Sequence, residues 1–345
     1  MQYIEEIISQ SHHLTLTAIF LLILIIVAAR TLLVRKPKPC RLLETDRPRD
    51  FKKLIEGGWS FVDKSLLIDE FCNFNGRLAV TTNLSMIAYF LSVSDSDKEF
   101  RTRRSLFKGL SIENRHETFE NFFAKFPVIY IDFMNTLVDH DTWDSMYKCL
   151  QDLISSVYRR HSYVSSSLNS TRQIVFQQII ECNRNLSRKE WEDALKALSC
   201  YLCKFHGKPI IALVDHLDVP VQISIDKGYF IEANRFIKNM FSEFLKENPY
   251  LEKAMVAIVD TSNKKIDKIL PANAWEYPLP SSDRVFQYGF GFTEADLIQL
   301  AKTFNVVDFD GIMKRTFQCK TGVKPKIALY NPQSVWSELY LRFNT

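Results

Sequence analysis

The sequence predicts an α/β fold in which a largely parallel sheet is flanked by helices and preceded by one transmembrane helix. A continuous apolar run at 210–214, bounded by Gly207 and Pro220, is typical of a strand buried on both faces. Apolar strand patterns also alternate with helical patterns along the chain, which favours parallel pairing. An uncharged apolar segment near the N-terminus indicates the membrane helix.

Residues 14–34 have the length and composition of a membrane-spanning helix. Arg30 is the only charge in this segment, and it stands near one end, where its side chain can reach the headgroups. A cleaved signal peptide would need positive charge before the apolar run, but the preceding residues contain two glutamates and no lysine or arginine. We therefore expect an uncleaved single-pass anchor, with residues 1–13 as a short extracytosolic N-terminus.

A basic linker that contains prolines, residues 35–49, follows the anchor. Residues 30–53 hold nine lysines and arginines against three acidic residues, a net of +6, while the whole chain carries +4. This bias predicts that the C-terminal side faces the cytosol, and Pro37 and Pro39 make the linker stiff. The remaining residues, 50–345, are expected to form one domain, and because they are slightly acidic we expect no nucleic-acid partner.

Seven cysteines without regular spacing favour a reduced compartment over a disulfide framework. Cys200, Cys203 and His206 lie close enough in sequence to suggest a zinc site, but no fourth ligand is evident. A helix that packs its cysteines into a core is the simpler interpretation.

Hydrophobic spacing defines the other elements. Further strands are expected at 127–133 and 254–259, and charged or Ser/Asn-rich composition predicts loops at 94–104 and 162–171. The last expected helix has Thr293 as its N-cap, with an acidic residue three positions later, close to a capping box. Helical spacing covers seven segments: 51–55, 65–71, 83–91, 143–159, 190–206, 231–246 and 293–303.

Two carboxylates, Asp215 and Asp218, follow the central apolar run. Ligands of open α/β sheets bind outside the carboxyl ends of the strands. An apolar strand tipped with aspartate resembles the Walker B element of ATPases, in which the aspartate holds magnesium, so Asp215 is the candidate metal ligand. The alternative is that both carboxylates cap backbone amides at the strand end.

Several segments in order resemble the AAA-ATPase-like domain family, uncharacterised proteins often fused to a restriction-endonuclease-like domain. The resemblance covers about residues 50–340 and implies a phosphate-loop-NTPase-like fold, with ATP and magnesium as the family's cofactors. The matching motifs are Phe-Val-Asp-Lys at 61–64, Asn-Leu-Ser-Met at 83–86, Pro-Val-Ile-Tyr at 127–130, Val-Asp-His-Leu-Asp-Val-Pro at 214–220, Asn-Pro-Tyr-Leu-Glu-Lys at 248–253, Gly-Phe-Thr-Glu at 291–294 and Tyr-Asn-Pro at 330–332.

The chain departs from the family at the phosphate site. The family carries Pro-Arg-Arg-Phe-Gly-Lys-Ser/Thr before Asn-Leu-Ser-Met, and the amides and lysine of such a loop hold phosphates. Residues 75–82 read Asn-Gly-Arg-Leu-Ala-Val-Thr-Thr instead. Either the Gly-Lys pair is replaced by Ala-Val, or 77–81 is a strand and the loop is deleted. The family's Asp-Glu pair is Asp215-His216 here. We therefore expect a degenerate member without the phosphate loop and without the nuclease-like domain.

These observations predict a membrane-anchored pseudo-ATPase that binds or scaffolds an unidentified protein partner, with no catalytic residues and no cofactor. The alternative is a protein that binds and hydrolyses ATP with magnesium at a non-standard phosphate site. Threonines before a helix are more often simply its N-caps, and this is the simpler interpretation of Thr81 and Thr82. The residues that would form the residual nucleotide site are Arg77, Thr81, Thr82, Asp215 and Asp218.

Overall fold

The structure, a computed structural model, places the body of the chain from residue 48 onward. The expected N-terminus 1–13, the expected membrane helix 14–34 and nearly all of the linker 35–49 lie outside the described residues. Within the part of the chain that is described, no helix combines the length and the apolar character needed to cross a bilayer. The described residues are 48–73, 77–80, 84–94, 96–137, 140–246, 248–257, 291–304, 306, 309–320 and 328–343.

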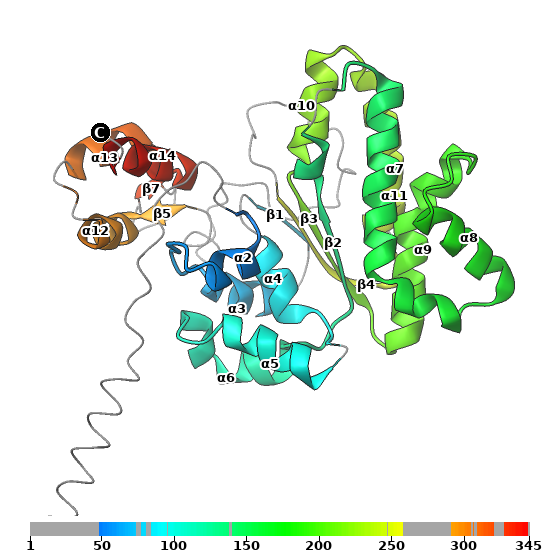
Figure 1. Cartoon of the computed structure of the whole chain (residues 1–345), viewed down its shortest axis with the longest axis horizontal. Helices are drawn as coiled ribbons and strands as arrows, with labels where there is room; N and C mark the ends of the chain where they lie inside the picture. The colour runs from blue at the N-terminus through cyan, green and yellow to red at the C-terminus, as the bar shows by residue number, and fades with distance from the viewer. Residues whose placement is uncertain are drawn as a thin grey trace, which may run out of the picture.

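A parallel sheet lies at the centre of the molecule (Figure 1). Parallel pairing of its strands confirms the predicted sheet type, and all six residues of β3 are buried because helices cover both faces. The strand expected at 254–259 begins earlier, at Leu251. The described strands lie in the order β1 (Arg77–Val80), β4 (Leu251–Ala257), β3 (Ile210–Asp215) and β2 (Val128–Asp132).

Alternate residues of each strand face opposite layers, so the sheet divides the core in two. Ile129 and Val214 belong to one core, while Val128 and Leu213 belong to the other. Figure 1 shows one helical layer on each side of the sheet. One layer contains α7 (Trp143–Arg160), α8 (Ser170–Ile180), α9 (Arg188–His206), α10 (Asp218–Asp226) and α11 (Phe230–Leu245). The other contains α2 (Phe51–Glu56), α3 (Leu66–Asn73), α4 (Leu84–Leu91), α5 (Asp97–Leu106) and α6 (His116–Phe122).

Helix ends follow the expected capping chemistry. Ser187 and Glu190 form a capping box at the start of α9. Gly207 ends the same helix in the left-handed region, with φ of 66°, a conformation that glycine adopts at little cost. Short 3₁₀ helices join the larger elements at Ser111–Asn114, Phe133–Thr136 and Ser162–Ser167.

The predictions of loops at 94–104 and 162–171 are wrong in part. Segment 94–104 contains most of α5, which Ser96 caps by accepting a hydrogen bond from the amide of Glu99. The helix is polar on most of its surface, so hydrophobic spacing did not indicate it. Its N-cap and its first-turn acids are the sequence signals that could have predicted it. Segment 162–171 is largely a 3₁₀ helix that leads into α8, capped by Asn169.

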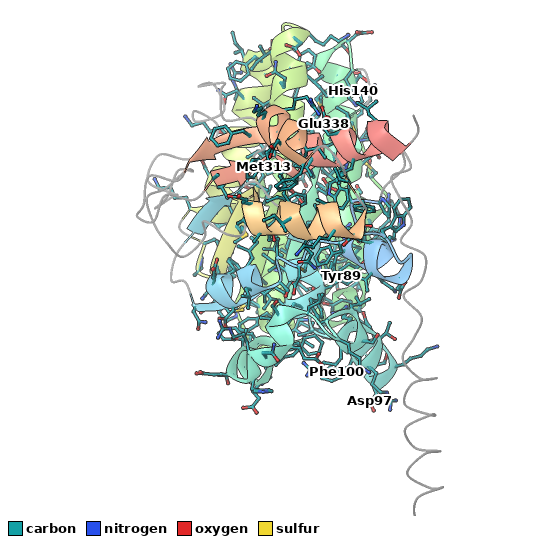
Figure 2. The ribbon with its side chains drawn as sticks, turned by 90° about the vertical axis from the view of Figure 1, so that its left-hand side faces the viewer. Tyr89, Asp97, Phe100, His140, Met313 and Glu338 are labelled. Carbon is teal, nitrogen blue, oxygen red and sulfur yellow. The ribbon has the colours of Figure 1, made fainter. Side chains whose placement is uncertain are left out.

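A small C-terminal unit packs beside α2 and α3 (Figure 1). Thr293 and Asp296 form a capping box at the start of its first helix, which confirms the predicted N-cap. Figure 2 shows Met313 and Glu338 in this unit, where Glu338 pairs with Arg315 at 2.9 Å. The unit contains an antiparallel sheet in the order β5 (Phe292–Thr293), β7 (Ala328–Tyr330), β6 (Phe317–Lys320), together with α12 (Glu294–Thr303), α13 (Phe309–Thr316) and α14 (Pro332–Phe343).

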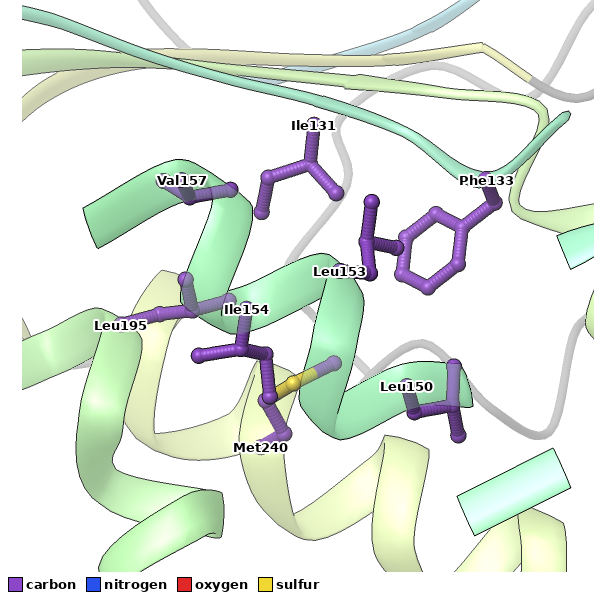
Figure 3. A pocket seen from close by; sticks show the side chains of 8 residues that line it. All are labelled: Ile131, Phe133, Leu150, Leu153, Ile154, Val157, Leu195 and Met240. Carbon is purple, nitrogen blue, oxygen red and sulfur yellow. The ribbon is translucent and has the colours of Figure 1, made fainter. Parts of the chain in front are cut away.

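A cavity of about 10 Å³ lies between β2 and helices α7, α9 and α11 (Figure 3). Ile131, Val157, Leu195 and Met240 are among its apolar lining residues. This volume is at the lower limit for one water molecule, and a water would need polar partners that the lining does not offer. The cavity is therefore a gap in packing rather than a ligand site.

Candidate functional site

Asp132 and Asp215 lie side by side at the carboxyl edge of the parallel sheet. Each is the last residue of its strand, and the two are register partners across the β2–β3 pair. This edge is where open α/β sheets bind ligands. Asp215 is 3% exposed, and Asp132 is partly exposed, so the edge presents one buried and one accessible carboxylate.

The Asp215 carboxylate is surrounded by donors from this chain. The amide of Leu84, the first residue of α4, lies 3.4 Å from Oδ2, and the Tyr130 hydroxyl lies 3.5 Å from the same oxygen. His216 Nδ1 lies 3.4 Å from Oδ1. Burial raises the pKa of Asp215 to about 6, although the charge of His216 opposes this rise. These contacts agree with the alternative in which Asp215 caps a backbone amide.

His216 bridges the two carboxylates. Its Nδ1 donates to Oδ1 of Asp132 at 2.9 Å, and Asp132 also accepts from the amide of Met134 at 2.9 Å. Burial by itself would lower the pKa of His216, but the hydrogen bond to Asp132 and the nearby carboxylates outweigh it and raise the pKa. The pKa of Asp132 is lowered, because its hydrogen bonds outweigh the effect of burial. Both shifts favour an ion pair between His216 and Asp132.

The backbone at His216 is in the left-handed region, with φ of 56°. A residue with a Cβ pays a steric cost there, and such strain is commonly found at functional sites. The turn is held by neighbouring bonds: Val219 donates to the carbonyl of His216 at 3.1 Å, and Leu217 donates to the carbonyl of Ala257 at 3.3 Å. The strained turn thus aims the imidazole at β2.

Asp218 is buried and is the first residue of α10. A carboxylate in the first turn of a helix interacts favourably with the helix dipole. The charge of Asp218 contributes to the raised pKa of His216. The two predicted aspartates, Asp215 and Asp218, thus both act on His216. The structure adds Tyr130 and Asp132, which sequence reasoning missed although both lie within the expected strand at 127–133.

The connection between β1 and α4 is short. β1 ends at Val80 and α4 begins at Leu84, so three residues, 81–83, join them. A phosphate loop of the form G-x-x-x-x-G-K-[ST] spans eight residues between its strand and helix. This spacing agrees with the interpretation in which the loop is deleted. Thr81, Thr82 and the side chain of Arg77 lie outside the described residues.

The first turn of α4 is occupied by bonds within the protein. Ser85 Oγ accepts a hydrogen bond from the amide of Phe51, 2.9 Å away, and this bond fastens the start of α2 to α4. The amide of Leu84 is likewise directed at the Asp215 carboxylate. These two groups are therefore already bonded within the protein, although a nucleotide phosphate would require groups of this kind at the helix N-terminus. The described residues therefore do not fit a standard phosphate and magnesium site.

The other sequence candidates have structural partners. Asp63 accepts hydrogen bonds from the amides of Ser65 and Ser111, and Lys64 pairs with Asp296 of α12 at 2.5 Å. His206 Nε2 lies 3.0 Å from the hydroxyl of Tyr163. Among the described residues, no group of three histidine, cysteine or acidic side chains is arranged to hold a metal ion.

Comparison with known proteins gives one match. A family model with the description "Predicted AAA-ATPase" matches residues 48–265, more than half of the chain. No curated protein and no solved structure matches. The matched residues include every described strand of the parallel sheet and both described helical layers, and they end before the small C-terminal unit.

Proposed function

This chain belongs to the AAA-ATPase-like family, and from that premise we propose that it is a membrane-anchored pseudo-ATPase that acts as a binding or scaffold module. Residues 14–34 are its anchor, the body faces the cytosol, and it presents the family fold to an unidentified protein partner. It does not use nucleic acid. The three-residue connection between β1 and α4 carries the proposal, because it has no room for the phosphate loop.

The residues around Asp215 support loss of catalysis. Phosphoryl transfer depends on positioning and on charge stabilisation by loop amides, a lysine and magnesium. Here the Asp215 carboxylate is contacted by the amide of Leu84, the hydroxyl of Tyr130 and the imidazole of His216. One missing cation beside a phosphate costs about 4 kcal/mol at intermediate dielectric, and each ~1.4 kcal/mol is a factor of ten in rate. We expect turnover to fall by roughly a thousandfold from the lysine alone.

The competing function is ATP binding at a non-standard site. It is favoured by one observation: the aspartate at the end of the central strand still faces the N-terminus of the helix that follows β1. In that case Arg77, Thr81 and Thr82 would contact phosphates, and Asp215 with Asp218 would hold magnesium.

The test uses the full chain in detergent or nanodiscs, with calorimetric titration of ATP and magnesium and a phosphate-release assay. We expect neither binding at micromolar concentration nor release above background. Val80→Lys should restore neither, because the loop is absent. Turnover that disappears in Asp215→Asn but persists in Asp226→Asn, an exposed aspartate of α10, would overturn the proposal and establish the ATPase alternative.

A further inference from the structure

Helix α5 presents a row of cations to solvent. Lys98 and Arg101 are three residues apart, and Ser105 follows four residues later on the same face of the helix. Ser105 carries no charge, but it marks the face on which the two cations lie. Lys108 extends the row just past the helix end, and all four residues are exposed. We call Lys98, Arg101 and Lys108 the α5 cation row. No ion pair is found for these three side chains among the described residues.

The other arginines of α5 are used inside the protein. Arg103 pairs with Glu99 and donates to the carbonyls of Ser92 and Val93. Arg104 lies over the ring of Phe119, 3.6 Å from its centroid. The helix therefore divides its positive charge into an inner pair that stabilises the fold and an outer row that the fold does not use. Asp97 is the exposed acid at the N-terminal end of the helix.

Helix α5 also carries an exposed aromatic side chain. Phe100 is 43% exposed, although its ring packs against that of Phe123, with the two ring centroids 5.2 Å apart. Figure 2 shows Asp97 and Phe100 together at the lower end of the body. Basic residues and aromatic rings are the residue types that interfacial helices present to anionic membranes.

The chain enters the body beside α5. Phe51, the first residue of α2, packs against Phe107, which directly follows α5, with ring centroids 5.2 Å apart. Asp50, one residue earlier, accepts a hydrogen bond from Tyr89 at 3.0 Å. The linker 35–49 leads to this point and spans at most about 50 Å when fully extended. An anchor at 14–34 would thus keep the point where the chain enters the body, and α5 beside it, within about 50 Å of the bilayer.

We propose that the α5 cation row docks on the anionic lipid surface of the membrane in which the chain is anchored. The proposal rests on the proposed function for its anchor. Charge complementarity decides the occupant: three outward cations, each attracted to an anionic leaflet, and an aromatic ring that suits the headgroup region. Docking fixes the orientation of the body, so that α5 faces the bilayer and α9 and α11, on the opposite side of the sheet, face away.

The experiment measures acylation of lysine amines by mass spectrometry on the full chain in nanodiscs. One set of discs contains only phosphatidylcholine, and the other also contains phosphatidylserine. Lys98 and Lys108 should be acylated about fivefold more slowly in the anionic discs. A cation near an anionic surface gains about 1 kcal/mol, which corresponds to a factor of about five. High salt should abolish the difference. Lys204 on α9 and Lys238 on α11, both exposed, serve as controls within the same molecule and should not change.

Two variants separate docking from general attraction. Lys98→Gln/Arg101→Gln/Lys108→Gln should lose the protection that anionic lipid gives to Lys125, an exposed residue two positions after Phe123, whose ring contacts Phe100 of α5. Lys204→Gln/Arg235→Gln/Lys238→Gln removes the same charge from the opposite helical layer and should keep it. Equal acylation of Lys98 and Lys108 in both discs would overturn the proposal. The same acylation measurement on native membranes is a third arm of the experiment. Protection of Lys98 and Lys108 there but in neither kind of disc would also overturn the proposal, and it would identify an acidic protein partner instead. Release of the full chain from membranes on carbonate extraction would refute the anchor at 14–34. That failure of the proposed function is distinguishable from a failure of α5 to dock.

Discussion

The backbone amide of Leu84 lies 3.4 Å from Oδ2 of Asp215, across 131 positions of sequence. This contact joins the helix that follows β1 to the end of the central strand, although β4 lies between β1 and β3. In a nucleotide-binding relative, phosphates and magnesium would separate a helix N-terminus from such an aspartate. Here the protein's own amide makes the contact, and several predictions depend on it.

Asp215→Asn should stabilise the folded protein at pH 7. The pKa of Asp215 is raised from 3.8 to about 6 in the folded state. Between these values the folded state keeps a proton that the unfolded state has lost, so stability falls as pH rises through this window. At about 1.4 kcal/mol per pKa unit, the neutral variant gains up to about 3 kcal/mol at pH 7, reduced by its weaker attraction to His216.

Urea unfolding of the full chain at pH 7 and at pH 4 measures this effect. The gain should vanish at pH 4, and Asp226→Asn should show no comparable gain at either pH. A loss of stability at pH 7 would show that the Asp215 anion stabilises the fold through His216, contrary to the prediction.

His216→Gly should retain more stability than His216→Ala. Both changes remove the imidazole from Asp132, but only glycine adopts a φ of 56° without a steric cost. We expect a difference of about 1 kcal/mol in favour of glycine. Measured unfolding free energies of the two variants provide the comparison, and equal values would mean that the strained turn relaxes when the side chain is removed.

Lys64→Met should loosen the C-terminal unit. The ammonium of Lys64 lies 2.5 Å from Asp296, and both side chains are mostly buried. Loss of one partner leaves the other charge poorly compensated, which costs roughly 1–3 kcal/mol. Hydrogen exchange should quicken in α12, where Asp296 also caps the helix.

Lys52→Met is the matched control for that change. Lys52 and Glu56 form an exposed pair at 3.9 Å, and pairs of this kind contribute little. Exchange in α12 should be unaltered in this variant. If both variants behave alike, Lys64 does not hold the C-terminal unit to the body.

No glycan should be present at Asn169 or Asn185. Both begin acceptor sequons and both are exposed, so the transferase could reach them if the body lay in the lumen. The positive residues after the predicted anchor place it in the cytosol instead. Treatment of the membrane-bound chain with an endoglycosidase should leave its mobility unchanged, while a shift that is lost in Asn169→Gln would reverse the topology.

Hydrophobic periodicity was enough to predict three of the sheet strands and seven of the thirteen described α-helices. The buried run at β3, the amphipathic pattern of α7 and the capping signals of α9 and α12 are local properties, readable within a few residues. Helix α5 was missed because its apolar stripe is narrow and its surface is polar. Strand β1 was left as one of two alternatives, because its four residues fit either a strand or a substituted loop.

The candidate site was decided by tertiary structure. The sequence indicated Asp215 and Asp218, but the partners of Asp215 come from β2 and α4, and the hydrogen bond from His216 to Asp132 spans 84 positions. Those contacts depend on the strand order, which places β2 beside β3 and brings α4 over the carboxyl edge. Local sequence signals carry the type and length of each element. Which strand ends meet is determined by how the sheet buries its two faces against both helical layers, and that is a property of the whole chain.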